Sequence, residues 1–214
     1  MASKSITTPK GIALWPNLLE PDTKFDAEGV YNVKLKLEGD DAEKLQAIID
    51  KGIKASAVQA KEENPKKKIK VADAPYHDEV DEEDEPTGAV IFNFKLKAIG
   101  KNGKTGKTWK QKPALFDAKG KPCQTEVTNG SAVRVNFVMV PFYTPLVGAG
   151  VSLRLQAVQI IELAEGWNKD ASAYGFDEEE GFEADDDAPP FTEEDDDYEG
   201  PEETDAEEED EDDF

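Results

Sequence analysis

The sequence predicts a mainly β protein: a small closed antiparallel barrel with one helix, followed by a disordered acidic tail. Three observations lead to this fold class. Several segments alternate apolar and polar residues with a period of two, as strands with one wet face do. A single segment has apolar residues at helical spacing, and no alternation of strands and helices indicates a parallel sheet. The length of 214 residues fits one ordinary domain with an appendage.

The first elements that alternation predicts are a strand and a helix. Residues 30–37 place Tyr31 and Leu35 on one face and Lys34 and Lys36 on the other. The next segment, which ends before Asn64-Pro65, opens with a capping-box pattern and continues at helical spacing. Its pattern residues are Asp40, Glu43, Leu45, Ile48, Ile49, Ile53 and Val58.

Residues 64–88 are predicted to be a long exposed loop. They begin with a basic run and end with an acidic one, in which Asp78 to Glu85 holds seven acids in eight residues. Four later segments alternate and are predicted to be strands: 90–97, 107–116, 133–139 and 151–157. The turn signal at residues 100–103 joins the first two into a hairpin. Residues 11–16 could add a further strand.

Charge divides the chain near residue 169. Residues 1–169 hold all 25 basic residues and 23 of the 48 acids, a net charge of +2, so residues 170–214 hold 25 acids and no base. A segment of such dense like charge cannot bury enough apolar surface to offset its ordering entropy. We therefore predict a single domain over residues 1–165 and a disordered tail over 166–214.

The residues disfavour several function classes. His77 and Cys123 are the only histidine and cysteine, so neither a nucleophile with its base nor a zinc site is indicated. Residues 101–108 end like a phosphate-binding loop, but Lys101 replaces its first glycine and the segment joins two predicted strands. No apolar run approaches the roughly 20 residues that span a bilayer. We predict no enzyme, cofactor, metal or membrane partner, and the single cysteine fits a reducing compartment.

The most informative cationic stretch lies between Pro86 and Phe116. It holds seven lysines and no acid, within a chain of net charge −23, and Trp109 lies among those lysines. Spaced cations suit backbone phosphates and an aromatic plane suits an unstacked base, so the pattern favours single-stranded nucleic acid. The alternatives are that the lysines only solubilise a wet face and that Trp109 fills the barrel.

Several segments resemble the single-stranded DNA-binding replication proteins of bacteriophage T7 and its relatives, over nearly the whole chain. The resemblance rests on one early strand, two late strands and an acidic tail that closes on an aromatic residue. The segments are residues 29–33 (Gly-Val-Tyr-Asn-Val), Val140-Pro141-Phe142, Val147-Gly148-Ala149, Leu153-Arg154-Leu155, Glu162-Leu163-Ala164 and Phe214. Residues 143–146 depart from the family pattern.

The resemblance implies an OB-type barrel capped by the helix and sequence-tolerant binding of single-stranded DNA in phage replication, recombination and repair. It implies that the tail gates the DNA groove and docks on the phage DNA polymerase and helicase-primase. It further implies a dimer, an action in the cytoplasm of the infected bacterial host, and a DNA contact by Phe142.

Residues and resemblance together predict two binding sites. The DNA-binding site comprises basic and aromatic side chains: Lys34, Lys36, Lys95, Lys97, Lys107, Trp109, Lys110, Lys112, Arg134, Phe142, Tyr143 and Arg154. The partner-binding site is the end of the tail: Asp210, Glu211, Asp212, Asp213 and Phe214. Aromatic side chains at a strand end, such as Phe142 and Tyr143, can be presented outward.

Three alternatives remain. An acidic DNA mimic or histone-type chaperone would use the carboxylates themselves to occupy a basic partner, and would have no DNA affinity of its own. A recombination or strand-annealing factor would use the same barrel, and this function can coexist with replication. An enzyme of phosphate transfer is the third, and ATP turnover would reveal it.

Overall fold

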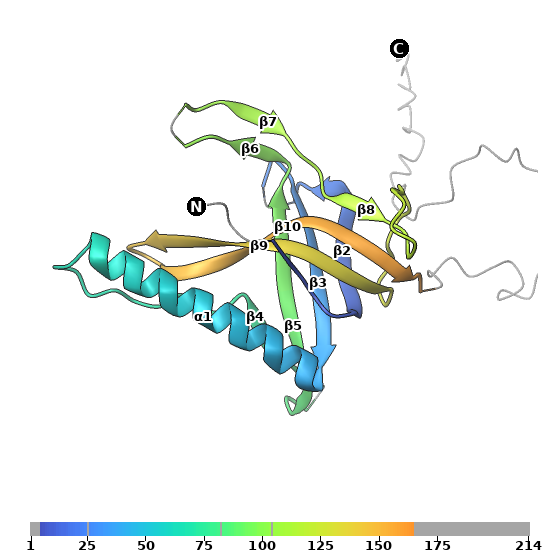
Figure 1. Ribbon diagram of the computed structural model, residues 1–214, viewed down its shortest axis with the longest axis horizontal. Coiled ribbons are helices and arrows are strands. Elements are labelled where there is room, and N and C mark those ends of the chain that lie inside the picture. The colour runs from blue at the N-terminus through green and yellow to red at the C-terminus, as the bar shows by residue number, and fades with distance from the viewer. Residues whose placement is uncertain (1–4, 25, 82, 104, 165–214) are drawn as a thin grey trace, which may run out of the picture. The chain divides into compact units, whose positions relative to one another are not determined.

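The computed structural model describes residues 5–164, with the exception of residues 25, 82 and 104. This part of the chain folds into strands and one long helix (Figure 1). The elements are β1 Ser5–Thr7, β2 Gly11–Asp22, β3 Val30–Glu38, α1 Gly39–Glu63, β4 Tyr76–Val80, β5 Pro86–Lys97, β6 Ile99–Lys101, β7 Thr108–Lys110, β8 Ala114–Phe116, β9 Ala132–Thr144 and β10 Gly148–Glu162. The mainly β class with one helix is confirmed. The predicted acidic tail lies outside the described residues.

Most of the strands belong to one strongly curved sheet. Its strand order is β1-β9-β2-β3-β5-β10-β8, with β4 paired to β5 and a further long pairing between β9 and β10. Strands β6 and β7 form a separate hairpin that projects from the body of the domain (Figure 1). The β9–β10 hairpin is the longest antiparallel pairing, from Gly148 opposite Thr144 to Glu162 opposite Ala132.

The predicted closed, wholly antiparallel barrel is wrong in two respects. Strand β10 runs parallel to both β5 and β8. The pairings return from β10 through β9 to β2, but β5–β10 and β2–β9 comprise only two residue pairs each, so the sheet does not close along its length. Alternation identifies the faces of a strand, but it carries no information about the strand's partner or direction, which explains both errors.

The core lies on the inner faces of β3, β5, β9 and β10. Phe92, Phe94 and Phe137 are completely buried, as their alternation with polar neighbours predicts. The rings of Phe94 and Phe137 lie 5.0 Å apart between centroids. A fully buried side chain of this kind contributes about 1.5–3 kcal/mol. This packing holds the strands whose opposite faces carry the cations.

The predicted helix is confirmed as α1, which packs against β9 and β10 (Figure 1). It buries Leu45, Ile49 and Ile53, three of the predicted apolar positions. The predicted capping box does not form: Glu38 is the N-cap without a side-chain cap bond, and Asp40 lies inside the first turn, where its charge favours the helix dipole. Among the described residues, no helix is both long and apolar enough to cross a membrane.

The segment 64–88, predicted to be a loop, contains strand β4. Tyr76 pairs with Phe92 and Asp78 with Val90, antiparallel to β5. The sequence Tyr-His-Asp-Glu-Val has only two apolar residues, so β4 shows little alternation of its own and is held by its ladder to β5.

The predicted strand 107–116 is broken into β7 and β8. Strand β7 pairs with the separate strand β6, which contains Gly100 and Lys101 of the predicted turn, and not with β5 as predicted, whereas β8 pairs with β10. Pro113 precedes β8, and proline cannot donate to a ladder. Strand β2 is longer than residues 11–16 and continues to Asp22.

Candidate nucleic-acid interface

The outer faces of three paired strands carry the centre of a basic surface. In the registers of the sheet Lys95 of β5 lies opposite Asn32 of β3 and opposite Arg154 of β10. One row further along, Lys34 lies opposite Asn93. Neighbouring strands are about 4.8 Å apart, so these cations are close neighbours on one face.

Lys95 and Arg154 are like charges placed opposite each other. Such pairs destabilise a sheet unless an anion compensates them. Lys34, Lys95 and Arg154 make no ion pair with any residue in the described part of the chain. The arrangement therefore suits an external anion such as a backbone phosphate.

The lysines at the two ends of this row are paired with acids. Lys36 Nζ lies 2.6 Å from Glu79 Oε2, and Lys97 Nζ lies 3.2 Å from Asp26 Oδ2. The pKa of the Glu79 carboxyl is lowered, mainly by its hydrogen bond with Lys36. The pKa of Asp26 is lowered too, first by a backbone N–H and then by Lys97. Of the four lysines predicted on β3 and β5, only Lys34 and Lys95 are thus unpaired within the described residues.

The β6–β7 hairpin extends the surface with an aromatic side chain. Trp109 is 48% exposed, so it does not fill the barrel. Its ring packs closely over Gly100, where an added Cβ would lie 2.4 Å from it. The indole Nε1–H donates to Gln111 Oε1 at 3.3 Å, and Gln111 Nε2 donates to the Lys97 carbonyl at 2.8 Å. Both contacts hold the indole against the hairpin base.

The other predicted hairpin residues are exposed cations. Lys107 and Lys110 flank Trp109 closely in sequence, and both are exposed. Lys112 is exposed between β7 and β8 and lines a small pocket with Phe116 and Cys123. The hairpin therefore combines an aromatic plane with several positive charges.

The predicted residues of β9 lie at opposite ends of that strand. Arg134 is exposed opposite Gln159, four residues from Val138, the partner of Arg154. Four residues of strand correspond to about 13 Å. Arg134 is therefore separated from the central cations by more than a strand spacing.

Phe142 and Tyr143 point to opposite faces of the β9–β10 hairpin. Phe142 lies opposite Gly150, and alternation puts it on the face of Ser152 and Arg154. Its ring is close to Gly150, where a Cβ would lie 2.9 Å from Cζ. Tyr143 lies opposite Ala149, hence on the other face. The structure thus brings Phe142, but not Tyr143, to the face of the central cations.

The sequence analysis did not single out Trp15, which the structure makes a candidate binding residue by its exposure. Trp15 is 66% exposed and lies at an irregularity of β2, between Leu14 opposite Lys34 and Asn17 opposite Asn32. Its φ is +50°, and its backbone N–H donates to Asn129 Oδ1 at 3.1 Å. The sequence signal that could have identified this residue is the Trp-Pro pair, which interrupts the alternation of the strand as a bulge does.

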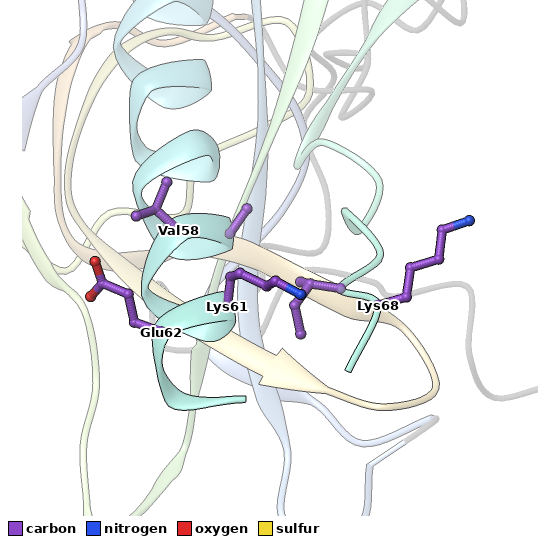
Figure 2. Close-up of a pocket in the computed structure, with 6 residues that line it drawn as sticks. Val58, Lys61, Glu62 and Lys68 are labelled. Atoms are coloured by element: carbon purple, nitrogen blue, oxygen red, sulfur yellow. The ribbon is translucent and has the colours of Figure 1, made fainter. Parts of the chain in front are cut away.

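An apolar pocket of about 490 Å³ lies between the end of α1 and the segment after it (Figure 2). Val58 contributes to its wall, and the Lys61 ammonium donates to the carbonyls of Pro65 and Lys67 at 3.1 and 2.9 Å. No group of three or more histidine, cysteine or acidic side chains within the described residues could hold a metal ion. These features do not form an acid–base site.

The family model for the single-stranded DNA-binding protein of bacteriophage T7 matches residues 14–163. The chain belongs to this phage single-stranded DNA-binding protein family. The protein of Escherichia phage T7 is 30% identical over 186 residues, which cover 77% of this chain and 78% of that protein. The protein of Enterobacteria phage T3 is 33% identical over 147 residues, which cover 64% of this chain and 63% of that protein.

Solved structures of phage single-stranded DNA-binding proteins have a similar fold. The crystal structure of the bacteriophage T7 protein has a TM-score of 0.64 and 29% identity, and the match covers 78% of this chain and 97% of that one. The bacteriophage Enc34 protein in complex with single-stranded DNA has a TM-score of 0.56 and 18% identity, and the match covers 77% of this chain and 89% of that one. At this identity the similarity shows a shared fold alone. The family consists of non-enzymatic binding proteins, so the expected family and the absence of an enzyme activity are confirmed.

Proposed function

We propose that this phage family member binds single-stranded DNA without sequence preference through an OB-type sheet, in DNA replication and recombination. The observation that carries this proposal is the row of unpaired cations Lys34, Lys95 and Arg154 beside an exposed aromatic hairpin. Phosphates of the strand contact these cations, and bases stack on Trp109 and on Phe142. The hairpin lysines and Arg134 contribute further phosphate contacts.

We propose that the acidic tail gates this surface. Residues 170–214 carry 25 acids and no base, so the tail resembles the polyanion that the surface binds. The end of the tail, with Asp210 to Asp213 and Phe214, presents an apolar anchor with flanking charge to basic pockets of the phage DNA polymerase and helicase-primase. The protein acts as a dimer in the cytoplasm of the infected host.

The test is a titration of fluorescent oligothymidine at several salt concentrations. The full-length protein and a chain ending at Lys169 are compared, which changes the net charge from −23 to +2. We expect both to bind single strands in preference to duplex, with the shortened chain tighter and with a changed salt dependence. Equal affinities would contradict gating.

The alternative of an acidic DNA mimic predicts a different result in the same titration. Neither protein would then bind oligothymidine, because the carboxylates alone would be functional. An annealing assay with complementary strands distinguishes a recombination role, since a protein that only coats DNA would not accelerate pairing.

A further inference from the structure

The Glu79 carboxylate is held against the Lys36 ammonium by residues of three neighbouring strands, β3, β4 and β5. Lys36 Nζ lies 2.6 Å from Glu79 Oε2, and the exposed side-chain fractions are only 26% and 22%. Thr87 Oγ1–H donates to the same carboxylate oxygen at 2.7 Å. Glu38 adds a more distant contact to Lys36, at 3.9 Å. The Lys36 ammonium is therefore engaged before any ligand arrives.

Strand β4 positions this carboxylate. Glu79 stands at an irregularity of the ladder, between Asp78 opposite Val90 and Val80 opposite Pro86. The acidic turn that follows is tied by its own hydrogen bonds, from the backbone N–H groups of Glu83 and Glu85 to Asp81 Oδ1 at 2.9 and 3.0 Å. An ordered acidic element thus borders one end of the basic row.

The opposite end of the row is different. The Lys97 side chain is 62% exposed, and its ion pair with Asp26 is 3.2 Å long. Exposed pairs are worth little, about 0–1 kcal/mol, and are readily exchanged for another anion. The pair of Lys36 is shorter, less exposed and supported by Thr87, so a phosphate would have to displace a hydrogen-bonded carboxylate.

We propose that Glu79 withholds Lys36 from DNA, so that the phosphate track on this face ends at Lys34 and does not cross β4. The inference rests on the proposed function of this face. It gives the acidic segment 78–85 a role: its charge repels phosphates beyond the last free cation. It also reassigns Lys36, which the sequence places among the DNA contacts.

The test uses full-length Glu79→Gln, which removes one charge and keeps an oxygen to accept from Thr87. Oligothymidine affinity is measured against salt. Lys36 becomes free for one further phosphate, so we expect tighter binding and a log–log salt slope steeper by about 0.7 than that of the wild type. Asp40→Asn is the matched control, because it removes one exposed acid from the start of α1; its slope should stay as in the wild type.

The double variant Lys36→Gln with Glu79→Gln keeps the wild-type net charge. It distinguishes a Lys36 that is withheld from DNA from a Lys36 that contacts DNA. If Lys36 is withheld, this variant binds with the affinity and slope of the wild type. A weaker affinity with a slope shallower by about 0.7 would show that Lys36 contacts DNA and would overturn the proposal. So would a Glu79→Gln variant that behaves like Asp40→Asn. Thermal unfolding of each variant confirms that the fold is kept.

The two proposals can fail separately. A wild-type protein that does not bind oligothymidine at any salt concentration contradicts the proposed function, and the withholding falls with it. A wild-type protein that binds, with Glu79→Gln showing no steeper slope than Asp40→Asn, contradicts the withholding alone.

Discussion

Trp15 combines backbone strain with exposure. Its left-handed φ of +50° costs a non-glycine residue about 1–2 kcal/mol, and the residue is 66% exposed. No burial of the ring offsets this strain, and Asn129 holds the backbone N–H in place. Strained residues that the surrounding structure maintains are concentrated at functional sites. Its neighbours Leu14 and Asn17 pair with β3 beside Lys34, so a base stacked on Trp15 would lie next to a phosphate contact.

Replacing Trp15 by glycine should separate stability from binding. Glycine adopts this φ without strain, and the relief offsets its larger entropy cost, so the free energy of unfolding should change by no more than about 1 kcal/mol. Loss of the stacking plane should weaken oligothymidine binding by about 1–3 kcal/mol, roughly 5- to 150-fold, with the salt slope unchanged. Urea unfolding and fluorescence titration measure the two effects. Trp15→Phe is the control, and wild-type affinity in the glycine variant would rule out stacking at this position.

At the scale of elements, the alternation of apolar and polar residues predicted the buried and exposed faces of each strand better than it predicted which strands pair. The cation-bearing faces of β3, β5 and β10 follow from residues two apart, as the buried Phe92 and Phe94 confirm. The apposition of Lys95 with Arg154 was not predictable, because it depends on a parallel pairing between strands far apart in sequence. The Lys36–Glu79 pair depends on β4, whose acids concealed its strand character. Alternation alone would put Trp15 on the buried face of β2 with Gly11 and Ala13, and the bulge exposes it instead.

Strand β4 is also tied to the helix. Tyr76 Oη–H donates to Asp50 Oδ1 of α1 at 2.7 Å, and its ring lies 5.5 Å from that of Phe92. Burial, followed by the hydrogen bond to Asp50, raises the pKa of Tyr76 to about 12. Because the pKa of Tyr76 is higher in the folded than in the unfolded protein, the protonated hydroxyl stabilises the fold. This contribution is complete below the unfolded value of 10.0 and is lost as the pH rises through about 12.

Tyr76→Phe should therefore lower the free energy of unfolding at neutral pH, and the variant should lose less stability than the wild type in alkaline solution. The substitution deletes the hydrogen bond from the tyrosine hydroxyl to the Asp50 carboxylate, which contributes about 1 kcal/mol at this half-buried site. Denaturant midpoints at neutral pH measure the loss, and an ultraviolet titration should lose the tyrosine step near pH 12 in the variant. A titration curve that keeps this step would assign the raised pKa to another tyrosine.

At the scale of the molecule, the excess of negative charge is confined to residues 170–214. Residues 1–169 have a net charge of +2, and the acids among them include those that hold Lys36 and Lys97. Binding of a polyanion therefore depends on a few unpaired cations rather than on overall charge, and under the proposed gating the acids of the tail would oppose it. Salt should weaken both effects together, which is why each comparison requires a full salt series.

Deleting Phe214 alone tests whether the tail has two separable roles. The deletion removes one aromatic ring and no side-chain charge, so electrostatic gating and oligothymidine affinity should stay as in the full-length protein. Binding to the phage DNA polymerase or helicase-primase should fall roughly 10- to 100-fold, because burial of a phenylalanine side chain contributes about 1.5–3 kcal/mol. Surface plasmon resonance with each partner and the DNA titration give the two numbers. The chain ending at Lys169 is the reference in which both roles are lost, and equal losses after removal of Phe214 would show that gating and recruitment are one property.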